Sequence, residues 1–203
     1  MAYSSRLKSL ERRIVALRKA FLPAQFSPQG LYSDQVLDNA RAFRVLVHAE
    51  IEHYIEDRAL EIASGAFDLY AKKSRATHPL VCLLTNAQGE QPGLPKKLGT
   101  KLTALTAVGK LLGQYRYTLT HNHGIRTHNL LQILLPIGIL ESEIDVVWLS
   151  TTDAFGLKRG ETAHSSSISS QIDPRDDYQT VQQVMAGLKD LDLLLNALKR
   201  KLR

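Results

Sequence analysis

The residues whose side chains could do chemistry are concentrated between Phe155 and Ser165, a segment that contains Arg159 and His164. Histidine titrates near neutral pH, so its imidazole can act as a general acid or a general base. Arginine stays charged, and its guanidinium can hold a phosphate with two donors. Metal-independent cleavage of RNA needs a base for the 2′-hydroxyl, an acid for the leaving 5′-oxygen and a cation for the phosphorane. Arg159 and His164 together supply much of this set of groups. The alternative is that the arginine is a surface residue and that the histidine has its hydrogen bonds satisfied within the fold.

The spacing of Arg159 and His164 restricts how they could act together. Positions five residues apart on a regular helix differ in direction by about 140°, because each residue turns the helix by ~100°. One helix therefore does not easily aim both side chains at one phosphate. Either Arg159 lies at a frayed first turn, or two copies of the chain combine across a two-fold axis.

Other charged residues are candidates for supporting roles. Lys158 and Arg126 could add contacts to phosphate, although a solvated surface explains them equally well. Glu52 and Glu56, with Arg58 close to them in the sequence, could orient the active residues or form surface pairs along a helix.

Three histidines, His121, His123 and His128, form a second polar cluster, for which a metal site is conceivable. No Cys, Asp or Glu lies between them, and their spacing fits no zinc pattern. We therefore expect a polar helix end, and no metal or other cofactor. The chain also lacks a Gly-x4-Gly-Lys-Ser/Thr phosphate loop and a Gly-x-Ser-x-Gly nucleophile elbow.

The spacing of the apolar residues predicts that helices position all of these side chains. A seam of apolar residues predicts a helix over about 4–22, and another predicts a long last helix that starts near Pro174. Further helices are expected over 33–73, 78–86, 100–120, 125–135, 141–155 and 157–165, with a break at Gly156 and loops at 88–99 and 165–173. Ile144, Val147, Trp148 and Phe155 should share one side of their helix. No segment alternates long enough to predict a strand.

These elements predict an all-α, up-and-down bundle of four to six helices. We expect residues 1–30 to form an N-terminal amphipathic helix and connector, and residues 31–203 to form the main helical domain. The length of 203 residues and the hydrophobic content of 44% suffice for such a core.

Charge and cysteine content bear on partners and compartment. The net charge of +6 fits a polyanion such as RNA or DNA, or simply a surface rich in Lys and Arg. The single cysteine, Cys82, lies in an apolar run, which indicates a buried thiol and a reducing compartment. No apolar run approaches the ~20 residues that span a bilayer, so we expect a soluble cytoplasmic protein with no membrane partner.

Two stretches resemble the HEPN superfamily. Residues 155–165 carry the family's Arg-x4-His pattern as Arg-Gly-Glu-Thr-Ala-His. Residues 44–56, which run from Arg44 through His48 and end in Ala-Glu-Ile-Glu-His-Tyr-Ile-Glu, resemble the long second helix of these proteins. The similarity covers roughly residues 33–170. It implies a homodimer with a groove lined by two Arg159 and two His164. It also implies an endoribonuclease of a toxin–antitoxin or antiviral defence system, restrained by an antitoxin or a regulatory partner.

One departure from the family pattern concerns the residue after the arginine. Many active members have Asn, Asp or His there, and this chain has Gly160; Glu161, Thr162 or Ser165 could take over the missing contact. Gly160 therefore leaves open a second hypothesis, a non-catalytic HEPN module that binds RNA, a nucleotide or a partner protein. A third hypothesis is a helical adaptor that uses the seams of residues 7–21 and 181–202.

Overall fold

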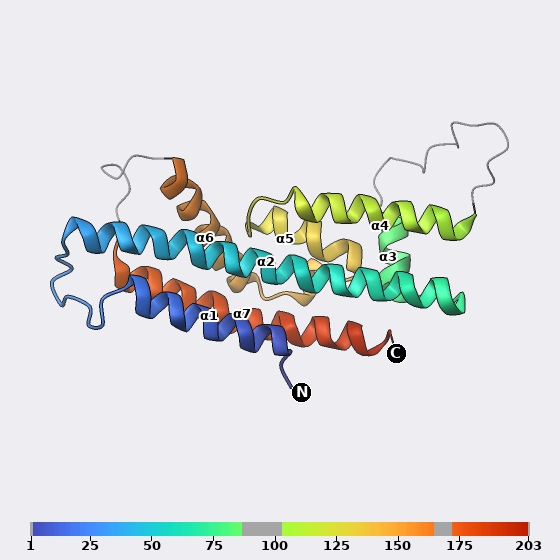
Figure 1. Cartoon of the computed structure of the whole chain (residues 1–203), viewed down its shortest axis with the longest axis horizontal. Helices are drawn as coiled ribbons and strands as arrows, with labels where there is room; N and C mark the ends of the chain where they lie inside the picture. The colour runs from blue at the N-terminus through green and yellow to red at the C-terminus, as the bar shows by residue number, and fades with distance from the viewer. Residues whose placement is uncertain (1, 87–102, 165–171, 203) are drawn as a thin grey trace. The chain divides into compact units, whose positions relative to one another are not determined.

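The computed structural model describes residues 2–86, 103–164 and 172–202, without the side chains of Ala163 and His164. Every regular element in this part of the chain is a helix, which confirms the prediction of an all-α bundle (Figure 1). There are seven α-helices in the described ranges, slightly more than the predicted four to six. They are α1 (Ser5–Phe21), α2 (Asp34–Lys73), α3 (His78–Asn86), α4 (Ala104–Thr120), α5 (Thr127–Leu134), α6 (Val146–His164) and α7 (Pro174–Arg200). Short 3-10 turns lie at Leu135–Ile137 and Glu141–Glu143.

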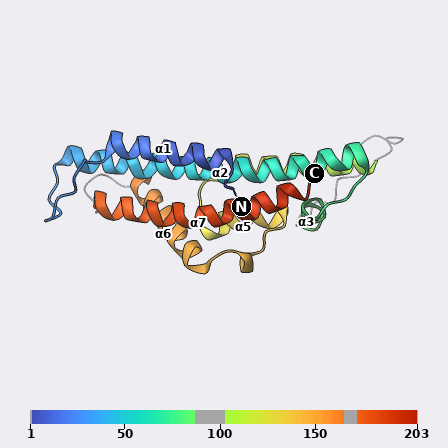
Figure 2. The same cartoon turned by 90° about the horizontal axis from the view of Figure 1, so that it is seen from below.

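The chain forms two compact units, and the first contains the candidate site. It comprises residues 1–54, 124–128 and 144–193, that is, α1, the first part of α2, α6 and most of α7. Within it, α1 runs beside α2 and α7 in both views (Figures 1 and 2). The seams predicted for the first and last helices form its core, with these side chains buried: Leu7, Leu10, Ile14, Leu17, Val181, Val184, Leu188 and Leu191.

A buried carboxylate anchors the start of α1 in this unit. Ser4 caps the helix, because its side chain accepts a hydrogen bond from the Leu7 amide at 3.0 Å. The Ser4 amide in turn donates to Asp192 of α7 at 2.7 Å, and the Tyr54 hydroxyl donates to the other oxygen of Asp192 at 2.6 Å. Asp192 is fully buried, so these bonds offset the cost of taking its charge out of water.

The second unit comprises residues 55–123, 129–143 and 194–203, and includes α3, α4 and most of α5. Ala66, Leu80 and Val108 form a small core there, and Phe67, Tyr70 and Leu202 pack against it. The Tyr115 hydroxyl donates to the Ile133 carbonyl at 2.6 Å, which satisfies both groups inside the unit. The predicted loop at 88–99 lies outside the described residues.

The region around Gly156 differs from the prediction. The predicted break does not occur, because α6 continues from Val146 to His164 through this residue. A Cβ at position 156 would lie 2.9 Å from Cγ of Arg126, so the glycine permits a close approach of the neighbouring segment instead of ending the helix. The prediction that Val147 shares one side of this helix with Trp148 and Phe155 was also wrong, since Val147 is 68% exposed whereas Trp148 and Phe155 are buried.

The start of α6 is set by a capping aspartate. The carboxylate of Asp145 accepts a hydrogen bond from the Trp148 amide at 2.7 Å, so the helix begins after Asp145 and not near Glu141. None of the described helices is both long enough and apolar enough to cross a membrane.

Candidate active site

Arg159 occupies a position near the C-terminal end of α6 in the first unit. Its side chain is partly exposed, but its Nε atom is buried and makes no hydrogen bond to any residue that the structure describes. Within the described residues, no acidic side chain forms an ion pair with Arg159 either. A guanidinium in this state retains donors for an anion.

His164 is the last residue of the same helix, and α6 is unbroken between the two positions. Arg159 therefore does not lie at a frayed first turn, which removes one of the two arrangements that the spacing allowed. The helix turns by about 140° between the two positions. The side chain of His164 lies outside the described residues, as does Ser165.

Arg44 of α2 forms a buried hub beside this part of α6. Its side chain is only 3% exposed. Nε and Nη2 donate to the two oxygens of Asp177 on α7, at 2.9 and 2.6 Å. Nη1 donates to Thr162 Oγ1 at 2.8 Å and to the Lys158 carbonyl at 3.3 Å. We call Arg44, Asp177, Thr162 and the Lys158 carbonyl the Arg44 clamp.

The charges in the Arg44 clamp neutralise each other. Burial raises the pKa of the Asp177 carboxyl, and the hydrogen bonds and charge of Arg44 oppose that rise. A bidentate pair in this geometry is among the stronger side-chain contacts in proteins. Arg44 thus has its cation matched inside the fold, in contrast to Arg159.

His48 lies one turn further along α2 than Arg44 and is 1% exposed. Its ring centroid is 6.0 Å from that of Phe155 on α6. Burial, followed by the charge of Arg159, lowers the pKa of His48 to about 4. The imidazole is therefore neutral at pH 7.

Glu52 lies beside His48 without bonding to its ring. Oε2 of Glu52 is 3.5 Å from Nδ1 of His48, yet this buried nitrogen has no hydrogen-bond partner among the described residues. Glu56, the other predicted supporting carboxylate, belongs to the second unit, where it accepts a hydrogen bond from Asn122 at 3.0 Å.

Arg126 contacts α6 further toward its N-terminus. Its Nε and Nη2 each lie 3.4 Å from an oxygen of Asp153. The Thr127 amide donates to Asp153 at 2.9 Å, and this backbone hydrogen bond is the main cause that lowers the pKa of the carboxyl. The pair fixes the start of α5 to α6 and leaves the Arg126 side chain 44% exposed.

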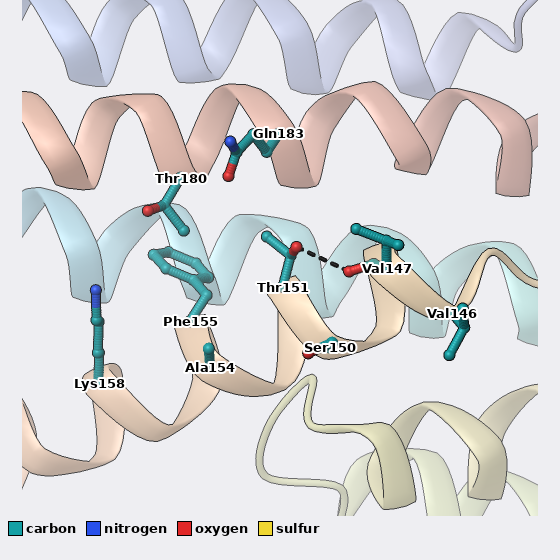
Figure 3. A pocket seen from close by; sticks show the side chains of 9 residues that line it. All are labelled: Val146, Val147, Ser150, Thr151, Ala154, Phe155, Lys158, Thr180 and Gln183. Atoms are coloured by element: carbon teal, nitrogen blue, oxygen red, sulfur yellow. Dashed lines mark hydrogen bonds between the residues drawn. The ribbon is translucent and has the colours of Figure 1, made fainter.

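The remaining predicted residues surround Arg159 along α6. Lys158 and Glu161 are exposed, and Thr162 is half-buried in the Arg44 clamp. Lys158 also borders an open groove of about 510 Å³ between α6 and α7, whose other lining residues include Val146, Val147, Thr151, Thr180 and Gln183 (Figure 3). Thr180 lies between α7 and Phe155 of α6 in this view.

The sequence prediction missed Arg44, His48 and Asp177 as parts of the site. A signal for the first two was present, because Arg44 and His48 directly follow the core residues Phe43 and Val47 of the same helix. Polar residues at that place border the buried face and need partners. For Asp177, the sequence offers no comparable signal.

The arrangement can bind an anion. In the described part of the chain, no group of three or more His, Cys, Asp or Glu side chains is placed to hold a metal ion. Comparisons of the chain with family models, curated proteins and solved structures found no match.

Proposed function

We propose that this protein is a metal-independent endoribonuclease of the HEPN type, with a composite active site formed by Arg159 and His164 in a homodimer. The observation that carries the proposal is the state of Arg159. Its guanidinium is partly exposed and has an unsatisfied buried donor, whereas Arg44 beside it is fully matched by Asp177. A phosphate at the exposed part of the guanidinium would supply the missing negative charge.

The geometry of α6 supports a composite site. Arg159 and His164 are on one continuous helix and five positions apart, so in a single copy the two positions lie about 140° apart around the helix axis. In a two-fold dimer, Arg159 of one protomer can meet His164 of the other at the same phosphate. Such a groove would contain two of each residue.

The proposed reaction is an internal phosphoryl transfer. The 2′-oxygen of the RNA attacks the phosphorus, the bond to the 5′-oxygen breaks, and a 2′,3′-cyclic phosphate or its hydrolysed form results. His164 moves a proton as general base or general acid. Arg159 stabilises the negative charge that develops on the phosphate oxygens. No metal or cofactor takes part.

The biological setting is part of the proposal. A cytoplasmic ribonuclease without restraint would damage the RNA of its own cell. We therefore infer a toxin–antitoxin or antiviral defence system, in which an antitoxin or a regulatory partner limits cleavage. The net charge of +6 supports an RNA substrate.

The test is cleavage of total cellular RNA in EDTA by the wild type, Arg159→Ala and His164→Ala. Each control removes the same residue type from an exposed site on another helix: Arg12→Ala on α1 and His53→Ala on α2. We expect cleavage by the wild type and both controls, and none by the two site variants, with the dimer intact in all. Full activity of His164→Ala would contradict the mechanism.

Gly160 favours a second candidate function, a non-catalytic module that binds RNA, a nucleotide or a partner protein. A Cβ at this position would meet none of the described residues within 4 Å, so among them the site has room for the polar side chain that active HEPN proteins often carry, yet none is present. Tight binding of RNA by the wild type, without cleavage of any RNA tested in EDTA, would favour this alternative.

A further inference from the structure

In the Arg44 clamp, Arg44 hydrogen-bonds to α6 at one residue before Arg159 in the chain and at one residue after it. Its two acceptors on α6 are the Lys158 carbonyl, directly before Arg159, and the Thr162 hydroxyl, three residues after it. The Thr162 hydroxyl itself donates to the Lys158 carbonyl at 2.8 Å, so the two acceptors are joined. Asp177 fixes the other side of the Arg44 guanidinium to α7.

We propose that Arg44 is a positioning residue for the Arg159–His164 element, and that it acts by holding the last turns of α6 against α2 and α7. Its catalytic consequence rests on the proposed function. The hold on the helix does not, and it can be measured in the absence of any activity.

The contacts of Arg44 identify its role as positioning and not as binding. Its three nitrogens make four hydrogen bonds within the protein. Four of its five N–H donors are therefore used, and its side chain is 3% exposed, so it lacks the access to take a phosphate. Arg159 differs, because its side chain is partly exposed and forms no ion pair with a described residue.

The end of α6 needs such a hold. The last four carbonyls of a helix have no partner within the helix, and helix ends fray. Arg159 and His164 both lie in the final turns of α6, which ends at His164. Fraying there would displace the two residues, and a displacement of about 1 Å can cost roughly a hundredfold in rate.

Thr162→Val tests the clamp without removing a charge. Valine keeps the branched shape of threonine but cannot accept the bond from Arg44. Thr151→Val is the matched control, because Thr151 is on the same helix and its hydroxyl also donates to the carbonyl four residues earlier at 2.8 Å. Among the described contacts, Arg44 does not bond to Thr151, so only Thr162→Val should weaken the hold.

The first readout is hydrogen exchange of the amides of residues 160–164. We expect exchange about tenfold faster in Thr162→Val than in the wild type, as for the loss of one hydrogen bond to a charged group. Thr151→Val should match the wild type. Equal exchange in the two variants would overturn the inference.

The second readout is RNA cleavage by Thr162→Val and by Arg44→Lys, which keeps a charge for Asp177 but loses the planar fork. We expect kcat to fall by about tenfold to a hundredfold with KM within about twofold of the wild type. Faster exchange with unchanged kcat would overturn the catalytic role. If the wild type does not cleave RNA at all, the proposed function fails, and the exchange result alone decides whether Arg44 holds the helix.

Discussion

His48 on α2 and Arg159 on α6 are electrostatically coupled inside the first unit. Burial contributes most to the lowered pKa of His48, about 4, and the Arg159 charge adds to it. A neutral imidazole therefore interacts with the Arg159 guanidinium at pH 7, without repulsion between two positive charges.

The lowered pKa of His48 predicts that stability falls in mild acid. The unfolded chain binds a proton near pH 6.5, whereas the folded state binds it only near pH 4. His48 therefore contributes roughly 3 kcal/mol to the free energy of unfolding above pH 6.5, and this contribution is lost progressively as the pH falls to about 4. Urea unfolding at pH 7.5 and pH 4.5 measures it.

The variant His48→Leu isolates this effect, because other groups also titrate in the same range. Asp177, whose pKa burial raises, contributes in the opposite direction. We expect the difference in unfolding free energy between the two pH values to be smaller in His48→Leu than in the wild type. A difference that His48→Leu leaves unchanged would show that His48 is not the group responsible.

Removal of the Arg159 charge should move the titration of His48. In Arg159→Met, the pKa of His48 should rise above about 4 but stay below 6.5, because burial is the larger cause and remains. Nuclear magnetic resonance of the imidazole signals as a function of pH gives this value. Arg12→Met, on the exposed face of α1, should leave it unchanged.

Gly160 and Gly187 should respond in opposite ways to alanine. Gly160→Ala adds a methyl group to a helix where none of the described residues lies within 4 Å of it, and should stabilise the protein by about 0.5–1 kcal/mol. Gly187→Ala would drive its Cβ into Cδ1 of Trp148, and we expect a loss of about 1–3 kcal/mol. Thermal unfolding of the two variants beside the wild type distinguishes them, and a destabilised Gly160→Ala would contradict the first expectation.

Tyr54→Phe should destabilise the first unit. The variant removes the hydroxyl that donates to the buried Asp192 carboxylate, at an expected cost of about 1–3 kcal/mol. Tyr117→Phe is a suitable control, because Tyr117 is 64% exposed. Chemical denaturation should separate the two variants, and equal midpoints would indicate that Asp192 gains another donor.

The spacing of apolar residues predicted the helices correctly. It did not predict that α6 continues through Gly156, where tertiary packing opposes the local preference of glycine. The seams of α1 and α7 were predictable because their apolar residues repeat with the helix period. The break at Gly156 was wrong because the local cost of glycine in a helix is only about 1 kcal/mol. Burial of Phe155 and the close approach of Arg126 outweigh that cost.

In the candidate site too, some residues could be predicted from the sequence and others depend on the tertiary fold. Arg159 and Lys158 were recognisable from residue type and spacing. Arg44 and Asp177 were not, because they are 133 residues apart in the chain and meet only through the packing of α2 and α7. No pattern within one helix specifies such a pair, and its partners follow from the tertiary fold alone.

The Arg44 clamp also has a consequence for synthesis of the protein. Its members are spread from residue 44 to residue 177, and the last of them is near the start of α7. A nascent chain whose α7 is still inside the ribosome cannot close the clamp, so the end of α6 is fixed only after Asp177 has emerged and α7 has packed against α2. Until then, the contacts of Arg44 with Thr162 and the Lys158 carbonyl lack the support of Asp177.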